Sequence, residues 1–156
     1  MTLVRLRDHL AADCVAVQLP STDKRGALQT MVDLVCEQGL VQDGRLFMQA
    51  LLRREDIVST GVGNGLAMPH ADVPDLSSPR LALGVFPKGV DFESLDEEPV
   101  YVVFLLMGTP KTPGLHMKLL ARIARMSKDP DFFRNLRSAK KPADILAALE
   151  AAELEH

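Results

Sequence analysis

Residues 100–107 read Val-Tyr-Val-Val-Phe-Leu-Leu-Met, the longest apolar run in the chain. The run is rich in β-branched and aromatic residues and shows no alternation between apolar and polar positions. A strand with this pattern is typically covered on both faces, as in a sheet that lies between layers of helices. The run is also far too short to cross a bilayer as a helix. It therefore predicts the central strand of an α/β domain.

The segments around this run alternate between strand-like and helical patterns. Residues 14–19, 65–68 and 81–86 are predicted to be strands, and residues 72–79, which hold two prolines, are predicted to be a loop. We expect a short helix at residues 3–10. Longer helices, each with one apolar face, are expected from 21 or 23 to 38, and at 43–54, 115–126, 131–137 and 143–152. The pattern predicts a single-domain α/β fold with a mixed sheet of about five strands flanked by helices.

Composition and charge narrow the classes of function. The 156 residues, 47% of them hydrophobic, suffice for one domain, which we assign to residues 1–153. The net charge of −3 argues against binding of nucleic acid, which needs a basic face. Cys14 and Cys36 indicate reduced thiols, and the charged first residues lack the apolar core of a signal peptide. We expect a cytoplasmic protein without membrane insertion, and we interpret residues 154–156 as the remnant of a purification tag.

A glycine-rich stretch ends in a histidine. Residues 54–70 read Arg-Glu-Asp-Ile-Val-Ser-Thr-Gly-Val-Gly-Asn-Gly-Leu-Ala-Met-Pro-His. Because glycine has no Cβ, the amides of Gly61, Gly63 and Gly65 are expected to approach an anion closely and to form a concave anion site. An imidazole such as that of His70 is a nucleophile near neutral pH. An imidazole beside an oxyanion cradle predicts a residue that accepts a phosphoryl group.

Four further side chains are candidates for the same site. The hydroxyls of Ser59 and Thr60 are predicted phosphate ligands. Arg54 is expected to pair with the phosphate, and the alternative is a solvated cation at a helix end. His116 lies at the start of a predicted helix, where free N–H groups favour anions. It either donates to a phosphoryl oxygen or orients the nucleophile, or it is a half-buried histidine without a role.

Two nucleotide-binding interpretations fail, and a metal site remains as an alternative. A P-loop requires Gly-Lys followed by Ser or Thr, whereas Leu-Ala-Met follows Gly65. A dinucleotide loop requires Gly-x-Gly-x-x-Gly after a strand, whereas this stretch follows a predicted helix. A metal-dependent hydrolase would use His70, Asp72 and His116 as a two-histidine, one-carboxylate site. Nothing in the sequence shows that these three converge, so we predict no metal and no cofactor.

The stretch at residues 54–70 resembles the enzyme IIA family of the bacterial phosphoenolpyruvate-dependent phosphotransferase system, in its fructose, mannitol and nitrogen-regulatory branch. The family pattern has Arg-Glu, then Ser-Thr-Gly or a variant, then Gly-x-Gly-x-Ala-x-Pro-His, all present here. Residues 89–92, residues 96–100, the apolar run and a helix opening on Leu-His recur downstream in the same order. The resemblance therefore covers nearly the whole chain.

The resemblance implies that His70 is phosphorylated, that His116 is the second active-site histidine and that Arg54 is the arginine at the loop entrance. It implies a histidine phosphocarrier protein as the donor, and regulatory target proteins or a IIB domain as the acceptor. The Ser-Thr-Gly form and the lack of a fused transport domain favour the nitrogen-regulatory subtype over a fructose-type sugar component. A homodimer is left open.

The chain departs from the family pattern directly after His70. The family often has Gly and then a basic residue at these two positions, where this chain has Ala71 and Asp72. A carboxylate at this place would repel an incoming phosphate unless it points away or pairs with a cation.

Overall fold

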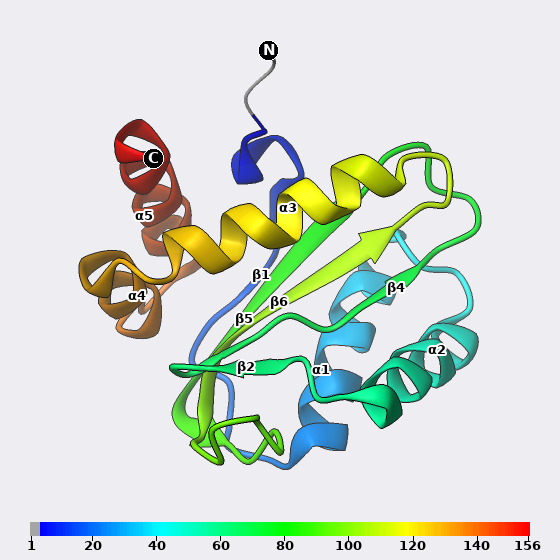
Figure 1. Ribbon diagram of the computed structural model, residues 1–156, viewed down its shortest axis with the longest axis horizontal. Coiled ribbons are helices and arrows are strands. Elements are labelled where there is room, and N and C mark those ends of the chain that lie inside the picture. Colours follow the sequence, from blue (N-terminus) through cyan, green and yellow to red (C-terminus); the bar gives the residue numbers. More distant parts are fainter. Residues whose placement is uncertain (1–3) are drawn as a thin grey trace.

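A mixed sheet of six strands lies between layers of helices in the computed structural model, which describes residues 4–156 (Figure 1). The order is β1-β5-β6-β3-β2, and β4 also pairs with β6. The predicted single-domain α/β fold with a mixed sheet is confirmed, with six strands instead of about five. The strands are β1 (Leu10–Ala16), β2 (Gly61–Gly63), β3 (Leu66–Ala67), β4 (His70–Asp72), β5 (Arg80–Val90) and β6 (Val100–Gly108).

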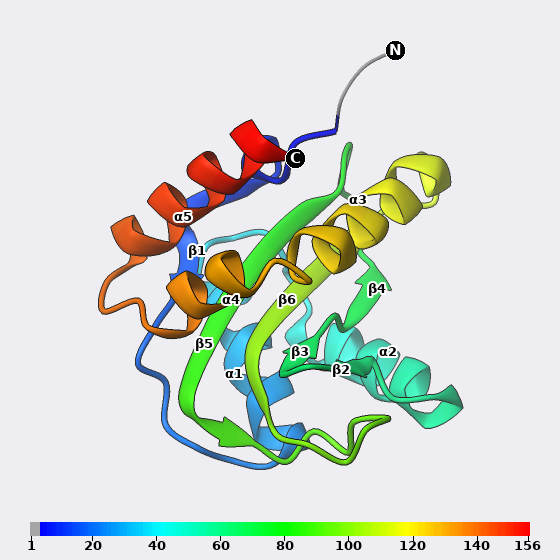
Figure 2. The same cartoon turned by 60° about the vertical axis from the view of Figure 1, so that its left-hand side comes forward.

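Helices cover both faces of the sheet (Figure 2). On one side, α1 packs against β5 and α2 against β4; on the other, α3 and α4 pack against β6, and α5 lies along β1. Within the described part of the chain, no helix is both long enough and apolar enough to span a membrane. The helices are α1 (Lys24–Glu37), α2 (Gly44–Ile57), α3 (Pro113–Met126), α4 (Pro130–Arg137) and α5 (Pro142–Glu155).

The predicted central strand is confirmed as β6. Every residue of β6 is buried except Tyr101, which is half-buried. The strand pairs antiparallel with β5 along most of its length and parallel with β3 and β4 on its other edge. Pairing on both edges and helices on both faces explain why the strand carries no polar alternation.

Side-chain caps begin α1 and α2 where the sequence places them. The Asp23 carboxylate accepts a hydrogen bond from the Gly26 amide, and the Asp43 carboxylate accepts one from the Leu46 amide. Both satisfy amides that have no partner within the helix. The helix α2 continues to Ile57, beyond the predicted end at residue 54.

The predicted helix at residues 3–10 is wrong over its described part. Residues 6–8 form one 3₁₀ turn and β1 begins at Leu10. The amides of Leu6 and Arg7 donate to the Glu153 carboxylate on α5 instead of to a helix of their own. Of the predicted strand at 14–19, residues 14–16 form the end of β1. Residues 17–19 lie outside the strand, and Gln18 has a left-handed backbone (φ 56°).

The strand β4 was not predicted, because it is three residues long and follows a proline. Its pairing depends on the free edge of β6. The Leu106 amide donates to the Pro69 carbonyl, and the Val73 amide donates to the Gly108 carbonyl. In this register His70 lies beside Leu106, which fixes the nucleophile candidate near the carboxyl end of β6.

Candidate functional site

Three elements that are far apart in the sequence meet around His70. Arg54 comes from the last turn of α2, His70 opens β4, and His116 lies in the first turns of α3. All three side chains are half-buried. The structure therefore brings together the three residues that the sequence singled out on separate elements.

The partners of His70 define which ring nitrogen carries its proton. Nδ1 lies 2.9 Å from the Met68 carbonyl oxygen, and Nε2 lies 3.3 Å from Nε of Arg54. A carbonyl only accepts and a guanidinium only donates, so these contacts assign the proton to Nδ1 and the lone pair to Nε2. The lone pair of the ring thus lies on Nε2, which faces the arginine.

His116 stands against His70 edge to face. The ring centroids are 5.2 Å apart and the planes meet at 79°. The pKa of His116 is lowered, first by burial and then by the neighbouring His70, while Asp72 raises it in opposition. Burial disfavours the charged imidazolium, so His116 is held in the neutral form, which has one N–H to donate.

Asp72 and Gly108 were not assigned to a phosphate site by the sequence, and both lie next to His116. A Cβ added to Gly108 would stand 2.5 Å from Nδ1 of His116 and 2.8 Å from Oδ1 of Asp72. The carboxylate of Asp72 therefore faces the site. Gly108 at the end of β6 leaves room for both side chains because it has no side chain of its own. A glycine that directly ends the apolar run is the signal that would have pointed to this position.

The loop after α2 is held by a buried carboxylate. Glu55 is 7% exposed, accepts hydrogen bonds from the amide and the hydroxyl of Thr60, and pairs with Nζ of Lys24 at 2.9 Å. These contacts hold the loop in a position where the Val58 carbonyl accepts a hydrogen bond from Nη1 of Arg54 at 2.9 Å. Glu55 thus positions the loop that orients the arginine.

Ser59, Thr60 and Gly61 make contacts within this loop and with its neighbours. The Thr60 hydroxyl donates to Glu55, and the Ser59 hydroxyl lies 3.2 Å from the Phe92 carbonyl. The Gly61 amide donates to Oγ of Ser59 at 3.1 Å. In this geometry the three predicted phosphate ligands build the loop, and their donors point to protein acceptors.

The glycine stretch forms a β-hairpin instead of the predicted cradle around His70. Gly61 pairs with Ala67 and Gly63 with Leu66, and the Gly65 carbonyl accepts from the amides of residues 101 and 102. His70 pairs with residue 106, four to five positions further along β6. At about 3.3 Å per residue, Gly65 lies roughly 15 Å from His70. The turn needs glycine because Gly63 and Gly65 have φ of 102° and 84°.

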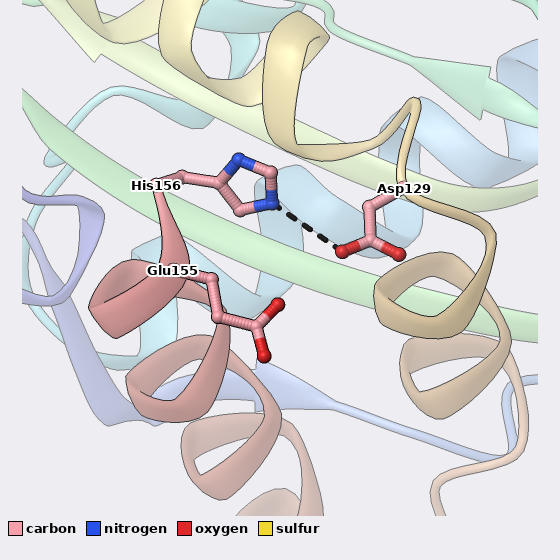
Figure 3. A group of neighbouring side chains, drawn as sticks. All are labelled: Asp129, Glu155 and His156. Atoms are coloured by element: carbon pink, nitrogen blue, oxygen red, sulfur yellow. Dashed lines mark hydrogen bonds and ion pairs between the residues drawn. The ribbon is translucent and has the colours of Figure 1, made fainter.

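The structure does not assemble the alternative metal site. Across residues 4–156, the set of side chains whose ligand atoms all lie within 4.8 Å of one another is Asp129, Glu155 and His156 (Figure 3). That set lies between the end of α5 and the start of α4 and excludes His70, Asp72 and His116. Its His156 ring lies 3.3 Å from Asp129, which contributes to the lowered pKa of that carboxyl.

Comparison with protein families gives one broad match and two types of relative. A family model described as "Phosphoenolpyruvate-dependent sugar phosphotransferase system, EIIA 2" matches residues 8–152. A nitrogen regulatory protein of Bradyrhizobium diazoefficiens is 33% identical over 144 residues, which cover 92% of this chain and 94% of that protein. The fructose-specific EIIABC component of Bacillus subtilis is 28% identical over 92% of this chain, which spans only 22% of that protein.

Among solved structures, nitrogen regulatory protein IIA-Ntr from Neisseria meningitidis has the same fold. The TM-score is 0.82 over 91% of this chain and 97% of that one, with 22% identity. The layered arrangement of sheet and helices is therefore shared over nearly the full length of both chains.

Proposed function

Because this chain belongs to the EIIA 2 family of the phosphoenolpyruvate-dependent sugar phosphotransferase system, whose role is to carry phosphoryl groups, we propose that its carrier atom is Nε2 of His70. One observation carries the proposal. The Met68 carbonyl holds the proton on Nδ1, so the lone pair lies on the nitrogen that faces Arg54. The family supplies the chemistry, and this geometry supports the choice of atom.

The proposed step moves one phosphoryl group between two imidazoles. The Nε2 lone pair attacks the phosphorus of a phosphohistidine on a donor carrier protein, and the N–P bond of the donor breaks with its electron pair returning to the donor ring. As the new bond forms, positive charge develops on the His70 ring. The Met68 carbonyl, which accepts from Nδ1–H at 2.9 Å, stabilises that charge.

Arg54 and His116 flank the attacking atom and supply the charge stabilisation that phosphoryl transfer requires. When the phosphoryl group arrives, the Arg54 guanidinium donates to its oxygens instead of to Nε2. His116, held neutral by burial, donates through its remaining N–H. The residues Ser59, Thr60 and Gly61 act through the loop that positions Arg54, and Gly63 and Gly65 shape the hairpin.

We propose the nitrogen-regulatory subtype, with regulatory proteins as the partners that read the phosphorylation state. The relative of that type matches over 94% of its own length and is the more similar of the two in sequence. The second candidate is a fructose-type sugar component that passes phosphate to a IIB domain, which is favoured by the match to an EIIABC protein. A cytoplasmic location stays a prediction.

The phosphorylation site is tested with a phosphorylated histidine carrier protein as the donor. The expected product is an acid-labile, base-stable phosphoryl label on the peptide that contains His70. The variant H70A should lose the label entirely, whereas H9Q should keep it. His9 is a suitable control because its Nδ1 also lies against a carbonyl, that of Pro79, at 2.8 Å. A full label on folded H70A protein would refute the assignment.

The subtype is tested by comparing the proteins captured by unphosphorylated protein, phosphorylated protein and H70A. A phosphoryl group adds about two negative charges, so a regulatory partner should bind one state and release the other. H70A should behave as the unphosphorylated form under both conditions. Transfer of the label to a purified IIB domain without any such change in partners would instead favour the sugar component.

A further inference from the structure

A pocket of about 540 Å³ lies far from His70, between α4 and the turn of the β2–β3 hairpin. Figure 2 shows α4 lying across β5 and β6 on the face that also carries α3. The pocket adjoins Tyr101 of β6, whereas His70 pairs with Leu106 of the same strand. These two positions of β6 are about 16 Å apart along the strand. Its lining residues are Asn64, Ser127, Lys128, Pro130, Phe133, Arg134 and Arg137.

One aromatic side chain, Phe133, lines the pocket, and the turn of the hairpin packs against it. A Cβ on Gly65 would stand 3.0 Å from Cζ of Phe133 and 3.2 Å from Cδ2 of Tyr101. The Arg137 guanidinium lies 3.4 Å from the centroid of the Tyr101 ring. Gly65 therefore brings the hairpin into contact with two rings, and the half-buried Phe133 offers a flat apolar surface at the pocket.

Three cations gather at this pocket in a chain whose net charge is −3. Arg134 forms an ion pair with Asp131, so Lys128 and Arg137 are the two cations that could bind an anion. Within residues 4–156, neither Lys128 nor Arg137 forms an ion pair. Asp96 accepts hydrogen bonds from the amides of residues 64 and 98, and Asp129 caps α4 and lies against His156. Neither carboxylate lines the pocket. The charged side chains that line the pocket are therefore all cations.

A hydroxyl at this pocket also lacks a partner. Oγ of Ser127 is buried and, among the residues that the structure describes, it has no hydrogen-bond partner. A buried hydroxyl without a partner is costly, so a ligand that formed a hydrogen bond with it would relieve that cost. Ser127 is one of the residues that line the pocket, and this observation is independent of the charges.

We propose that this pocket binds a small anion that joins a phosphate group to a planar ring, as a nucleoside monophosphate does. Lys128 and Arg137 would bind the phosphate, Ser127 would add a hydrogen bond, and the ring would stack on Phe133. The volume lies within the ordinary range for small-molecule sites. The site is separate from the phosphorylated histidine, so the proposal does not depend on the proposed function.

The test is an NMR titration of ¹⁵N-labelled protein with adenosine 5′-monophosphate. Saturable shifts are expected at the amides of Asn64, Gly65, Ser127 and Phe133. Adenosine and inorganic phosphate, each added alone, should bind far more weakly. The variants K128Q and R137Q should each weaken binding by about tenfold or more, because each removes a charge-assisted hydrogen bond. The control R125Q removes an exposed cation of α3 that does not line the pocket and should bind as the unmodified protein does.

Three outcomes would overturn the proposal. They are the absence of saturable shifts at the pocket, an equal response to inorganic phosphate alone, and a response to an acidic peptide in place of the nucleotide. Circular dichroism should show K128Q and R137Q to be folded, and both should accept phosphate on His70 at the normal rate. If only R137Q is misfolded, K128Q alone decides the question.

Discussion

Each ring nitrogen of His70 has a hydrogen-bond partner, and together the two partners determine which nitrogen carries the proton. Nδ1 faces a carbonyl that can only accept, and Nε2 faces an arginine that can only donate. The sequence identifies His70 from its position behind a proline and a glycine-rich stretch. It cannot identify Nε2 as the nitrogen that carries the lone pair, because that depends on the position of Arg54 on a different element.

Arg54 should matter for phosphoryl transfer far more than its neighbour in the sequence. We expect R54Q to slow transfer by about 10² or more, because it removes a preorganised cation from the attacking atom. The matched control is R53Q, since Arg53 is exposed and has no hydrogen bond to the histidine. Rapid-quench kinetics with the phosphorylated donor measure both rates. Equal rates for the two variants would remove Arg54 from the mechanism.

Asp72 should tune the protonation of His116. Its carboxylate raises the pKa of His116 against the larger effect of burial, so D72N should lower that pKa further. The acid side of the pH profile for phosphoryl transfer should then move to lower pH, because the neutral imidazole persists further into acid. Titration of the ring protons by NMR measures the shift, with D75N as the control. An upward shift in D72N would contradict this electrostatic account.

The lowered pKa of His116 also makes stability depend on pH. The unfolded chain takes up the proton near the ordinary value of 6.5, whereas the folded protein takes it up only at lower pH. The free energy of unfolding should therefore fall as the pH drops below about 6.5, and level off below the folded pKa. Urea denaturation at several pH values measures this slope, and H116Q should reduce it.

At the scale of elements, the segment that follows α2 depends on one buried carboxylate. Glu55 binds both the amide and the hydroxyl of Thr60 and pairs with Lys24 from the start of α1. The segment therefore ties α1 and α2 to the entrance of the site. The sequence indicates a loop of special function here, but its pattern does not distinguish an anion site from a tight hairpin.

Replacement of Glu55 should loosen this segment and Arg54 together. We expect E55Q to lower the free energy of unfolding by about 3 kcal/mol, because it leaves Lys24 without its charged partner. Phosphoryl transfer should slow as well, since the Val58 carbonyl no longer orients Arg54. The control E98Q changes an exposed carboxylate in another loop and should alter neither quantity. Urea denaturation and the transfer assay provide the two measurements.

At the scale of the whole molecule, one ion pair connects the two ends of the described chain to α3. Arg122 on α3 is 2% exposed and binds Oε2 of Glu153 on α5 through Nε and Nη2 at 3.1 and 3.0 Å. The same carboxylate accepts hydrogen bonds from the amides of Leu6 and Arg7, which precede β1. The helix that carries His116 is therefore fixed from behind by residues more than a hundred positions apart.

Loss of the Glu153 carboxylate should destabilise the entire fold. We expect E153Q to lower the free energy of unfolding by about 3 kcal/mol, because a buried arginine loses its charged partner. The control is E150Q on the same helix, where the side chain is 66% exposed and its ion pair with Arg7 spans 3.6 Å. Urea denaturation should show little change for the control. An equally small change for E153Q would mean that the ion pair does not stabilise the fold.

Local patterns in the sequence were enough to predict the α/β fold, the central strand, the starts of α1 and α2, and the histidine candidates. These features depend on residues within a few positions of one another, such as a cap and the amide that it accepts. The tertiary structure decided that Asp72 and Gly108 border His116, that Gly65 lies far from His70, and that the turn of the hairpin borders a pocket beside α4. Those distances follow from the register of β4 and β3 on β6 and from the packing of α3 and α4, which no short stretch of sequence specifies.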